Sequence, residues 1–153
     1  MLVMQGACEE AIDTLKRAHN GELRIYGMVD PNRNRSNGQL ALNRAYCLRR
    51  LDRGAEATEV IRLVRTYVDT LRENAAWGFA QLEAKLLILE GNTEKALDVL
   101  ESAVERFELY WEVRYDPIIS TLSSHPRFVA LFDSIDRNIE SLRDELGMPP
   151  ASI

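Results

Sequence analysis

The sequence predicts an all-α fold: a short right-handed α-α superhelix of stacked antiparallel helix pairs, closed by a capping helix at the C-terminal end. Three observations indicate this fold. Apolar residues recur at steps of three and four in several stretches, which is the period of a helix with one buried face. Glycine, asparagine and proline separate those stretches. Residues 5–18 repeat the pattern of residues 90–103, and internal similarity on this scale is typical of helical repeats.

Length and composition suit a single globular domain spanning residues 1–153, with 46% hydrophobic and 28% charged residues. The net charge of −5 argues against a nucleic-acid-binding surface, because the basic residues are scattered in small groups such as Arg49/Arg50. The chain has no apolar run of the ~18 residues that a membrane-spanning helix needs. Its first residues do not resemble a signal peptide. We expect a cytoplasmic protein without a membrane span, and the alternative is a fragment whose signal or membrane anchor lies upstream.

The clearest helix lies between Gly91 and Phe107. Gly91 readily adopts the left-handed conformation that ends a helix, and Thr93 is a good N-cap for the helix that follows. The small side chains of Ala96 and Ala103, one heptad apart, allow a neighbouring helix to approach closely. The apolar stripe of this helix consists of Ala96, Val99, Leu100, Ala103, Phe107 and Tyr110.

Two earlier segments carry related patterns. Residues 5–18 match closely, whereas residues 51–64 match more weakly, because their turn glycine is displaced to Gly54. These glycine and alanine positions resemble the tetratricopeptide repeat (TPR), although Ala80 stands where that family has an aromatic residue. The matching positions are Gly91, Ala96 and Ala103 in one copy and Gly6, Ala11 and Ala18 in another. The resemblance implies a protein-interaction module, with repeats over about residues 1–112 and a cap over 113–153.

The other helices follow from their apolar faces and from their stop signals. Rows of small residues, Ala41 and Ala45 in one helix and Ala80 and Ala84 in another, predict close packing between helices. The apolar periodicity and the stop signals together predict where each of these helices begins and ends. The expected helices are Ala7–Ala18, Gln39–Arg50, Ala55–Glu73, Ala75–Glu90, Thr93–Phe107 and Pro126–Leu146.

A long connection over residues 20–38 separates the first two of these helices. It contains turn formers such as Asn37-Gly38, and we interpret it as a solvated loop. Loops of this length are often functional. The alternative is therefore that Arg24, Arg33 and Arg35 bind an anion.

The C-terminal segment carries a second pattern. We expect Ser124 to be the N-cap of the last helix and Pro126 to occupy its first turn. The pattern resembles the element that closes repeat domains attached to bacterial adenylate-cyclase-like or winged-helix regulatory proteins, with His125 where an acidic residue is common. The matching residues are Asp116, Pro117, Leu122, Pro126, Arg127 and Phe128. This resemblance implies the C-terminal part of a longer bacterial signalling or transcription-regulatory protein, and a stand-alone adaptor or homodimeric scaffold is the alternative.

A heptad-like seam runs along the last helix. Its apolar residues step by four and three, which is the spacing at which one helix packs on another. Packing on the last repeat as a cap is the preferred interpretation, and pairing of two chains as a homodimer is the alternative. The seam consists of Phe128, Phe132, Ile135, Ile139, Leu142 and Leu146, and Gly147 ends it.

No pattern typical of catalysis stands out. The chain has no glycine-rich phosphate loop and no Gly-x-Ser-x-Gly elbow. His19 is the expected cap of a helix end, and His125 is an expected structural part of a turn. We expect Cys8 and Cys47 to be two buried thiols, with a disulfide or a metal site as the alternative. We therefore expect that the protein is not an enzyme and that it binds no cofactor or metal ion.

A stacked-repeat domain offers an inner groove, lined mainly by the first helix of each pair. The helical register places polar residues in this groove on two helices, together with Gly78. Amide, hydroxyl and cationic groups suit an extended peptide or its terminal carboxylate. We therefore expect a protein or peptide partner of unknown identity. The candidate groove residues are Gln39, Asn43, Tyr46, Arg50, Gln81 and Lys85.

Overall fold

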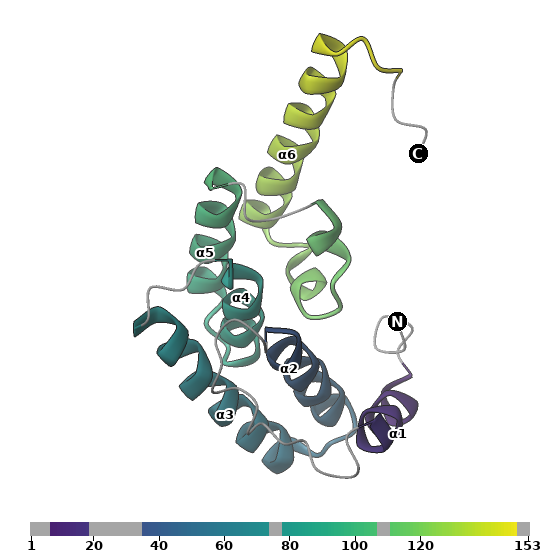
Figure 1. The fold of residues 1–153 in the computed structure, drawn as a ribbon, viewed down its shortest axis with the longest axis vertical. Helices are drawn as coiled ribbons and strands as arrows, with labels where there is room; N and C mark the ends of the chain where they lie inside the picture. The colour runs from purple at the N-terminus through teal and green to yellow at the C-terminus, as the bar shows by residue number, and fades with distance from the viewer. Residues whose placement is uncertain (1–6, 19–34, 74–77, 107–110, 150–153) are drawn as a thin grey trace.

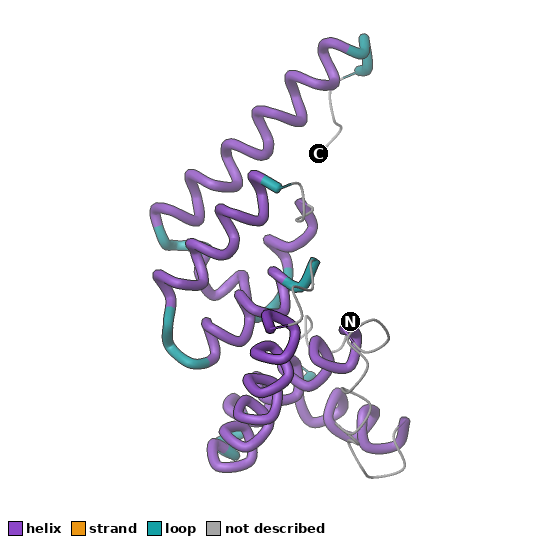
Figure 2. Tube along the Cα trace, turned by 60° about the vertical axis from the view of Figure 1, so that its left-hand side comes forward, coloured by secondary structure: helices purple, strands orange, loops and turns teal. Residues whose placement is uncertain are grey.

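All the secondary structure in the described part of the chain is helical (Figures 1 and 2). A computed structural model describes residues 7–18, 35–73, 78–106 and 111–149, and these contain no strand. The predicted all-α class is therefore confirmed. The α-helices are α1 (Cys8–Ala18), α2 (Arg35–Arg50), α3 (Gly54–Glu73), α4 (Ala80–Leu89), α5 (Thr93–Glu105) and α6 (Pro126–Glu145), and the short 3-10 helices are η2 (Trp111–Tyr115) and η3 (Ile119–Leu122).

Helices that follow one another in the chain pack side by side. α2 lies along α3, and α4 lies along α5. α4 also contacts α2 and α3, and α1 packs on α2. α6 contacts α5 and η2 at its first turns and extends away from the other elements, at the top of Figure 1. That these pairs wind into a right-handed, TPR-like superhelix stays a prediction.

Two apolar clusters meet at α4. The first joins α1, α2 and α3 to α4, and the second joins α4 to α5, η2, η3 and α6. Because α4 is covered by both clusters, most of its residues are buried. One face of α3 carries a row of apolar residues, and all of the residues in this row are buried. They are Ala57, Val60, Ile61, Val64, Val68 and Leu71.

Three helices end in the same way, with one residue in the left-handed conformation. The φ angles are 57° at Asp52, 82° at Gly91 and 64° at Gly147. In each turn the next amide donates a hydrogen bond of 2.8–2.9 Å to a carbonyl of the last helical turn. The prediction for Gly91 is confirmed. The turn glycine of the weaker copy, Gly54, is instead the first residue of α3, because Asp52 takes the left-handed position.

Two helix starts are shifted by one residue from their predicted positions. Asn92, and not Thr93, is the N-cap of α5. His125, and not Ser124, is the N-cap of α6, where its Nδ1 accepts a hydrogen bond of 3.3 Å from the amide of Arg127. The structural role expected for His125 is therefore confirmed, and an imidazole replaces the usual hydroxyl or carboxylate acceptor.

Two predicted helix bounds are wrong by several residues. α2 begins at Arg35, so Gly38 is helical and does not form a turn. A Cβ atom on Gly38 would lie 3.0 Å from both δ-methyl groups of Leu82, which explains why glycine suits this contact between α2 and α4. α4 begins at Ala80 and not at the predicted Ala75, and Gly78 has a positive φ of 72° just before it.

The two cysteines form a disulfide bond, so the expectation of two free thiols was wrong. Cys8 and Cys47 lie 4.9 Å apart between their Cα atoms, and both are buried, as predicted. The bond ties α1 to α2 across 39 residues. In the chain-entropy model a cross-link over a loop of this length contributes about 4 kcal/mol to stability.

Some sequence predictions concern residues outside the described ranges. These are the capping role of His19, most of the 20–38 connection with Arg24 and Arg33, and the last stripe residues Phe107 and Tyr110. The final part of that predicted connection belongs to α2.

Candidate functional site

A buried lysine joins three elements near the middle of the molecule. Lys85 of α4 is only 1% exposed. Its Nζ donates hydrogen bonds to Oδ1 of Asn43 on α2, at 2.7 Å, and to Oδ2 of Asp116, at 2.8 Å. The other carboxylate oxygen of Asp116 accepts from the amides of Ile118 at 2.9 Å and Ile119 at 3.3 Å. This Lys85 cluster therefore fastens the C-terminal segment to both helix pairs.

The Lys85 cluster is a structural feature and not a reactive one. Burial lowers the pKa of Lys85, and the attraction and hydrogen bond of Asp116 oppose that shift. A lowered lysine pKa is also found at nucleophiles and general bases. Here the amine is closed off from solvent, and two of its three N–H groups are engaged. A substrate therefore has no access to the nitrogen.

A second ionic cluster attaches α6 to α5 at the surface. Arg127, in the first turn of α6, bonds the carboxylates of Glu94 and Asp98 at 2.7 Å and that of Glu101 at 2.6 Å. These three carboxylates hold the pKa of Arg127 above its usual range. Arg127 and Asp116, both singled out by the C-terminal sequence pattern, thus hold the cap against different parts of the preceding helices.

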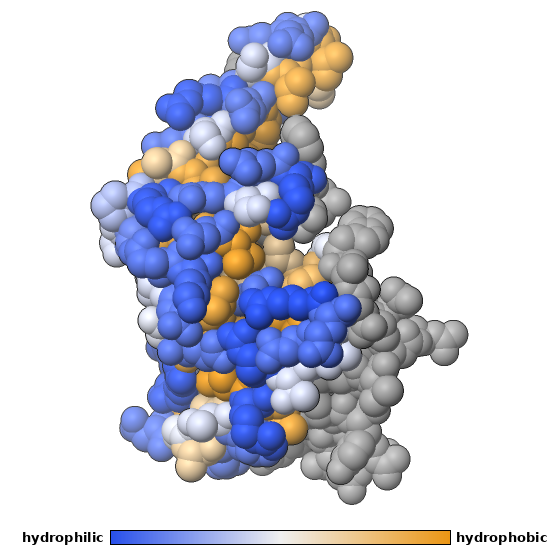
Figure 3. All heavy atoms as spheres, turned by 90° about the vertical axis from the view of Figure 1, so that its left-hand side faces the viewer, coloured by the Kyte–Doolittle hydropathy of each residue, from blue (hydrophilic) through white to orange (hydrophobic). Residues whose placement is uncertain are grey.

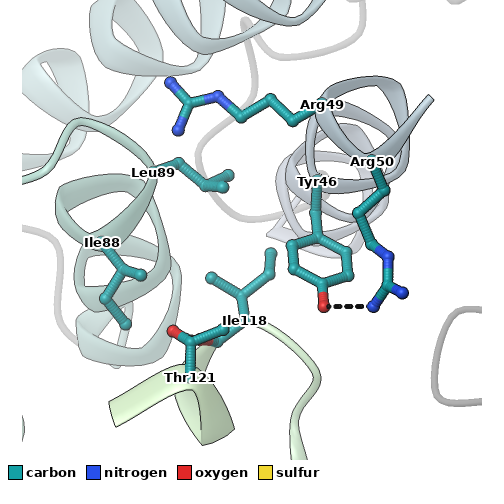
Figure 4. A pocket seen from close by; sticks show the side chains of 7 residues that line it. All are labelled: Tyr46, Arg49, Arg50, Ile88, Leu89, Ile118 and Thr121. Atoms are coloured by element: carbon teal, nitrogen blue, oxygen red, sulfur yellow. Dashed lines mark hydrogen bonds between the residues drawn. The ribbon is translucent and has the colours of Figure 1, made fainter. Parts of the chain in front are cut away.

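An open pocket lies one helical turn along from the Lys85 cluster, between α2, α4 and η3 (Figure 4). Tyr46 follows Asn43 by one turn on α2, and Ile88 follows Lys85 by one turn on α4. The pocket has a volume of about 320 Å³, near the lower end of the range for ligand sites. Its lining residues are Tyr46, Arg49, Arg50, Ile88, Leu89, Ile118 and Thr121.

The floor of the pocket is apolar and its edge is cationic. Leu89 and Ile118 are buried, whereas Arg49 and Arg50 are exposed, and Figure 4 shows the two guanidinium groups on opposite sides of the opening. Arg50 donates a hydrogen bond of 3.2 Å to the hydroxyl of Tyr46, and its guanidinium carbon lies 5.9 Å from the ring centroid. Within the described residues, neither arginine forms an ion pair. The site therefore offers N–H donors and positive charge beside an apolar wall.

The sequence of α2 accounts for this charge. The helix contains arginines and no aspartate or glutamate, and Arg49 and Arg50 occupy its last turn. Cations in this position interact favourably with the negative end of the helix dipole. That interaction stabilises the helix without neutralising the guanidinium groups, which stay free to meet an external anion.

The six predicted groove residues do not lie together in one groove. Tyr46 and Arg50 lie in the pocket. Asn43 and Lys85 do come together, but inside the Lys85 cluster and not in an open groove. The two glutamines, Gln39 and Gln81, are half-buried and do not line the pocket. Among the described residues, the amide oxygen of Gln39 is buried without a hydrogen-bond partner.

Sequence reasoning missed most of the pocket. Ile88 and Leu89 were not among the candidate residues, and Ile118 and Thr121 fell in the predicted cap, far along the chain. The useful signals were the helical register, which placed Tyr46 and Arg50 in the predicted groove, and the adjacent pair Arg49/Arg50 at a helix end. The packing of η3 against α4 brings Ile118 and Thr121 to that pair and makes it part of a site.

The described residues carry no other arrangement with a recognisable chemistry. They contain no group of three or more His, Cys, Asp and Glu side chains that could hold a metal ion. Nor is any helix among them both long enough and apolar enough to cross a membrane.

The chain matches no protein-family model, and comparisons with curated proteins and with solved structures find no similar protein. The resemblance to the TPR therefore stays a prediction from the sequence. Function has to be argued from the chemistry of the site.

Proposed function

We propose that the chain is a non-enzymatic protein-interaction module of the TPR type, which binds a peptide segment of its partner in the pocket between α2, α4 and η3. One observation carries the proposal: two exposed guanidinium groups without ionic partners among the described residues stand over an apolar floor. Enzymatic activity is not part of the proposal, because Lys85, whose pKa is lowered by burial, is closed off from solvent.

The chemistry of the pocket defines the peptide. Arg49 and Arg50 favour a carboxylate, because guanidinium–carboxylate hydrogen bonds are charge-assisted and strong. The hydroxyl of Tyr46 accepts from Arg50, so its own proton is available to a ligand oxygen. Leu89 and Ile118 provide the wall for an apolar side chain. The expected ligand is an extended segment with an apolar residue next to an acidic one or to the terminal carboxylate.

The test is a selection from a random peptide library with the purified chain, followed by the same selection with the double variant Arg49→Ala/Arg50→Ala. Arg62→Ala is the matched control, because Arg62 is an exposed arginine on α3, outside the pocket, and pairs with Glu59. The expected result is enrichment of acidic peptides with apolar residues by the unaltered chain and by the control. Equal enrichment by the double variant would contradict the proposal.

The larger context of the module is a further part of the proposal. The pattern around Asp116 and Arg127 supports a C-terminal region of a larger bacterial signalling or transcription-regulatory protein, since both residues hold the cap in place. The size of the native gene product tests this. A product much larger than 17.4 kDa is expected, and one of that size would favour a stand-alone adaptor.

The compartment can be tested through the cysteines. A cytoplasmic location remains our proposal, but stable disulfides are typical of oxidising compartments. The bond between Cys8 and Cys47 therefore gives the proposal a direct check. Alkylation of thiols under denaturing conditions, immediately after lysis of native cells, should label both residues in a reducing cytoplasm. Labelling that appears only after added reductant would place the protein in an oxidising compartment.

A second candidate function is a homodimeric scaffold. It is favoured by a separate observation, the exposed side chains of Leu142 in the C-terminal half of α6 and of Leu146 at its C-cap. The two functions use different surfaces and can coexist.

A further inference from the structure

The two halves of α6 have different surroundings. In the first half, Phe128, Leu131 and Phe132 are buried against the preceding elements. In the second half the helix extends past α5 (Figure 1), and the far end of the molecule shows apolar surface (orange in Figure 3). Leu142 is 57% exposed and Leu146 is 73% exposed there. One helix thus carries both a packed and an unpacked part.

The unpacked part continues the seam of the packed part. Ile135 is half-buried, packs on the second apolar cluster and links the two parts. Ile139, Leu142 and Leu146 follow it at steps of four, three and four, so they lie on the same face of the helix. Short helices are marginally stable in water without a packing partner. A contiguous exposed apolar stripe typically marks an interaction site. The seam therefore has the form of a contact surface for another helix.

The charges beside the seam match those of a second copy in the antiparallel direction. When Ile139 of one helix faces Leu142 of the other, Ile135 faces Leu146. In this register Arg143 of each copy lies next to Asp136 of the other. The dimer would therefore contain two intermolecular ion pairs. Antiparallel helices also bring opposite ends of their dipoles together. We propose that α6 pairs in this antiparallel register with α6 of a second copy of the chain.

Asp136 is already held in position for this contact. Arg114 of η2 bonds its two carboxylate oxygens, at 2.9 Å and 2.5 Å, and the guanidinium carbon of Arg114 lies 4.9 Å from the ring centroid of Phe132. The side chain of Asp136 is nevertheless 48% exposed. A carboxylate has about four acceptor positions, so Asp136 can accept from the second copy as well. Arg143, for its part, bonds the carbonyl of Pro149 and no carboxylate among the described residues.

The inference deepens the scaffold function proposed above, on which it rests, and it is independent of the peptide pocket. The contact involves about two heptads from each copy. Because this surface is small, the dimer should be weak and should form in the micromolar range. Dimerisation is measured without any peptide, so a failure of one proposal leaves the other intact.

Sedimentation velocity over a range of protein concentrations is the first test. The unaltered chain should shift from monomer to dimer as its concentration rises. Leu142→Glu should weaken the dimer at least about tenfold, because each copy loses a buried leucine. Val129→Glu is the matched control, since Val129 is 45% exposed on α6 but lies off the seam. Neither position is buried, so both variants should fold. A monomer at every concentration would overturn the inference.

Charge reversal and cross-linking test the register. Arg143→Glu should weaken the dimer, whereas Arg137→Glu, on the exposed side of α6, should not. In a mixture of Ile139→Cys and Leu142→Cys chains, disulfide-linked heterodimers should form. Leu146→Cys alone should not cross-link. In the antiparallel register the residues 146 of the two copies lie about 16 Å apart along the helix axis, at ~1.5 Å per residue. Rapid cross-linking of Leu146→Cys would show a parallel pair and overturn the proposal.

Discussion

The Lys85 cluster and the pocket are neighbours built on the same helices, yet their cations differ in exposure and in ionic partners. Lys85 is buried, and its amine is bonded to Asn43 and Asp116. Arg49 and Arg50, one turn along, are exposed and have no ionic partner among the described residues. Both regions carry positive charge. Only the pocket can present that charge to another molecule.

The helical domain uses a cation in two different ways. In the Lys85 cluster the charge is balanced internally, so its value is structural: it fixes the cap to the helix pairs. In the pocket the charge is balanced only by solvent, and an apolar floor next to it favours displacement of that solvent by a ligand. Substitutions in the cluster should therefore change stability, whereas substitutions in the pocket should change binding.

The largest effect is expected from Lys85→Ala. Removal of the amine leaves Asp116 partly buried without its cation and leaves a cavity, and breaking such a pair costs about 3–5 kcal/mol. The free energy of unfolding, measured by urea denaturation, should fall by this amount. Lys85→Met, which fills the volume without the charge, should be the milder change. A loss below about 1 kcal/mol for Lys85→Ala would mean that the cluster does not hold the cap.

The pH dependence of the free energy of unfolding should reflect the lowered pKa of Lys85. Its folded pKa is lower than the ordinary value of 10.5. Between these two pKa values the unfolded chain binds more protons than the folded chain, so the free energy of unfolding should rise with pH in that window. Below the window this contribution to stability is absent. Urea denaturation at several alkaline pH values should show a steeper rise for the unaltered chain than for Lys85→Met, and equal slopes would contradict the assignment.

The helices were predictable from the sequence because their signals are local. The apolar face of α3 and the left-handed turn at Gly91 are set by residues within a few positions of one another. The Lys85 cluster was not predictable, because Lys85 lies 42 residues from Asn43 and 31 from Asp116. A lysine in an apolar stretch suggests a solvent-facing position. Only the two distant acceptors make its burial possible.

The disulfide was predicted only as an alternative, and most of the pocket was missed, for the same reason. Cys8 and Cys47 are separated by 39 residues, and nothing in either local sequence indicates that α1 packs on α2 at these positions. Ile118 and Thr121 reach the pocket because η3 packs on α4. Periodicity specifies which side of a helix is apolar, but it does not specify which other element covers that side.

A smaller effect is expected from Arg127→Ala, which removes the surface contacts of α6 with α5. Arg127 is partly exposed, so solvent and salt screen its interactions with Glu94, Asp98 and Glu101. The loss of thermal stability should be smaller than for Lys85→Ala and should shrink when salt is raised to about 1 M. A loss as large as that of Lys85→Ala, and independent of salt, would place the main attachment of the cap at Arg127.

The smallest effect on stability is expected in the pocket. Arg49→Ala and Arg50→Ala remove exposed side chains without ionic partners among the described residues, so each should change the free energy of unfolding by no more than about 0.5 kcal/mol. Urea denaturation measured side by side with Arg62→Ala provides the comparison. A loss well above that of the control would mean that the pocket arginines support the fold.

The most direct test of the account is the affinity of a library-selected peptide for three folded proteins, measured by isothermal titration calorimetry. Arg49→Ala/Arg50→Ala should bind roughly 10- to 100-fold more weakly than the unaltered chain, because charge-assisted hydrogen bonds are lost. Lys85→Met, at a temperature where it is fully folded, should bind with nearly unchanged affinity. The opposite pattern, with binding lost in Lys85→Met and kept in the double arginine variant, would place the binding site in the Lys85 cluster and contradict the division between the two regions.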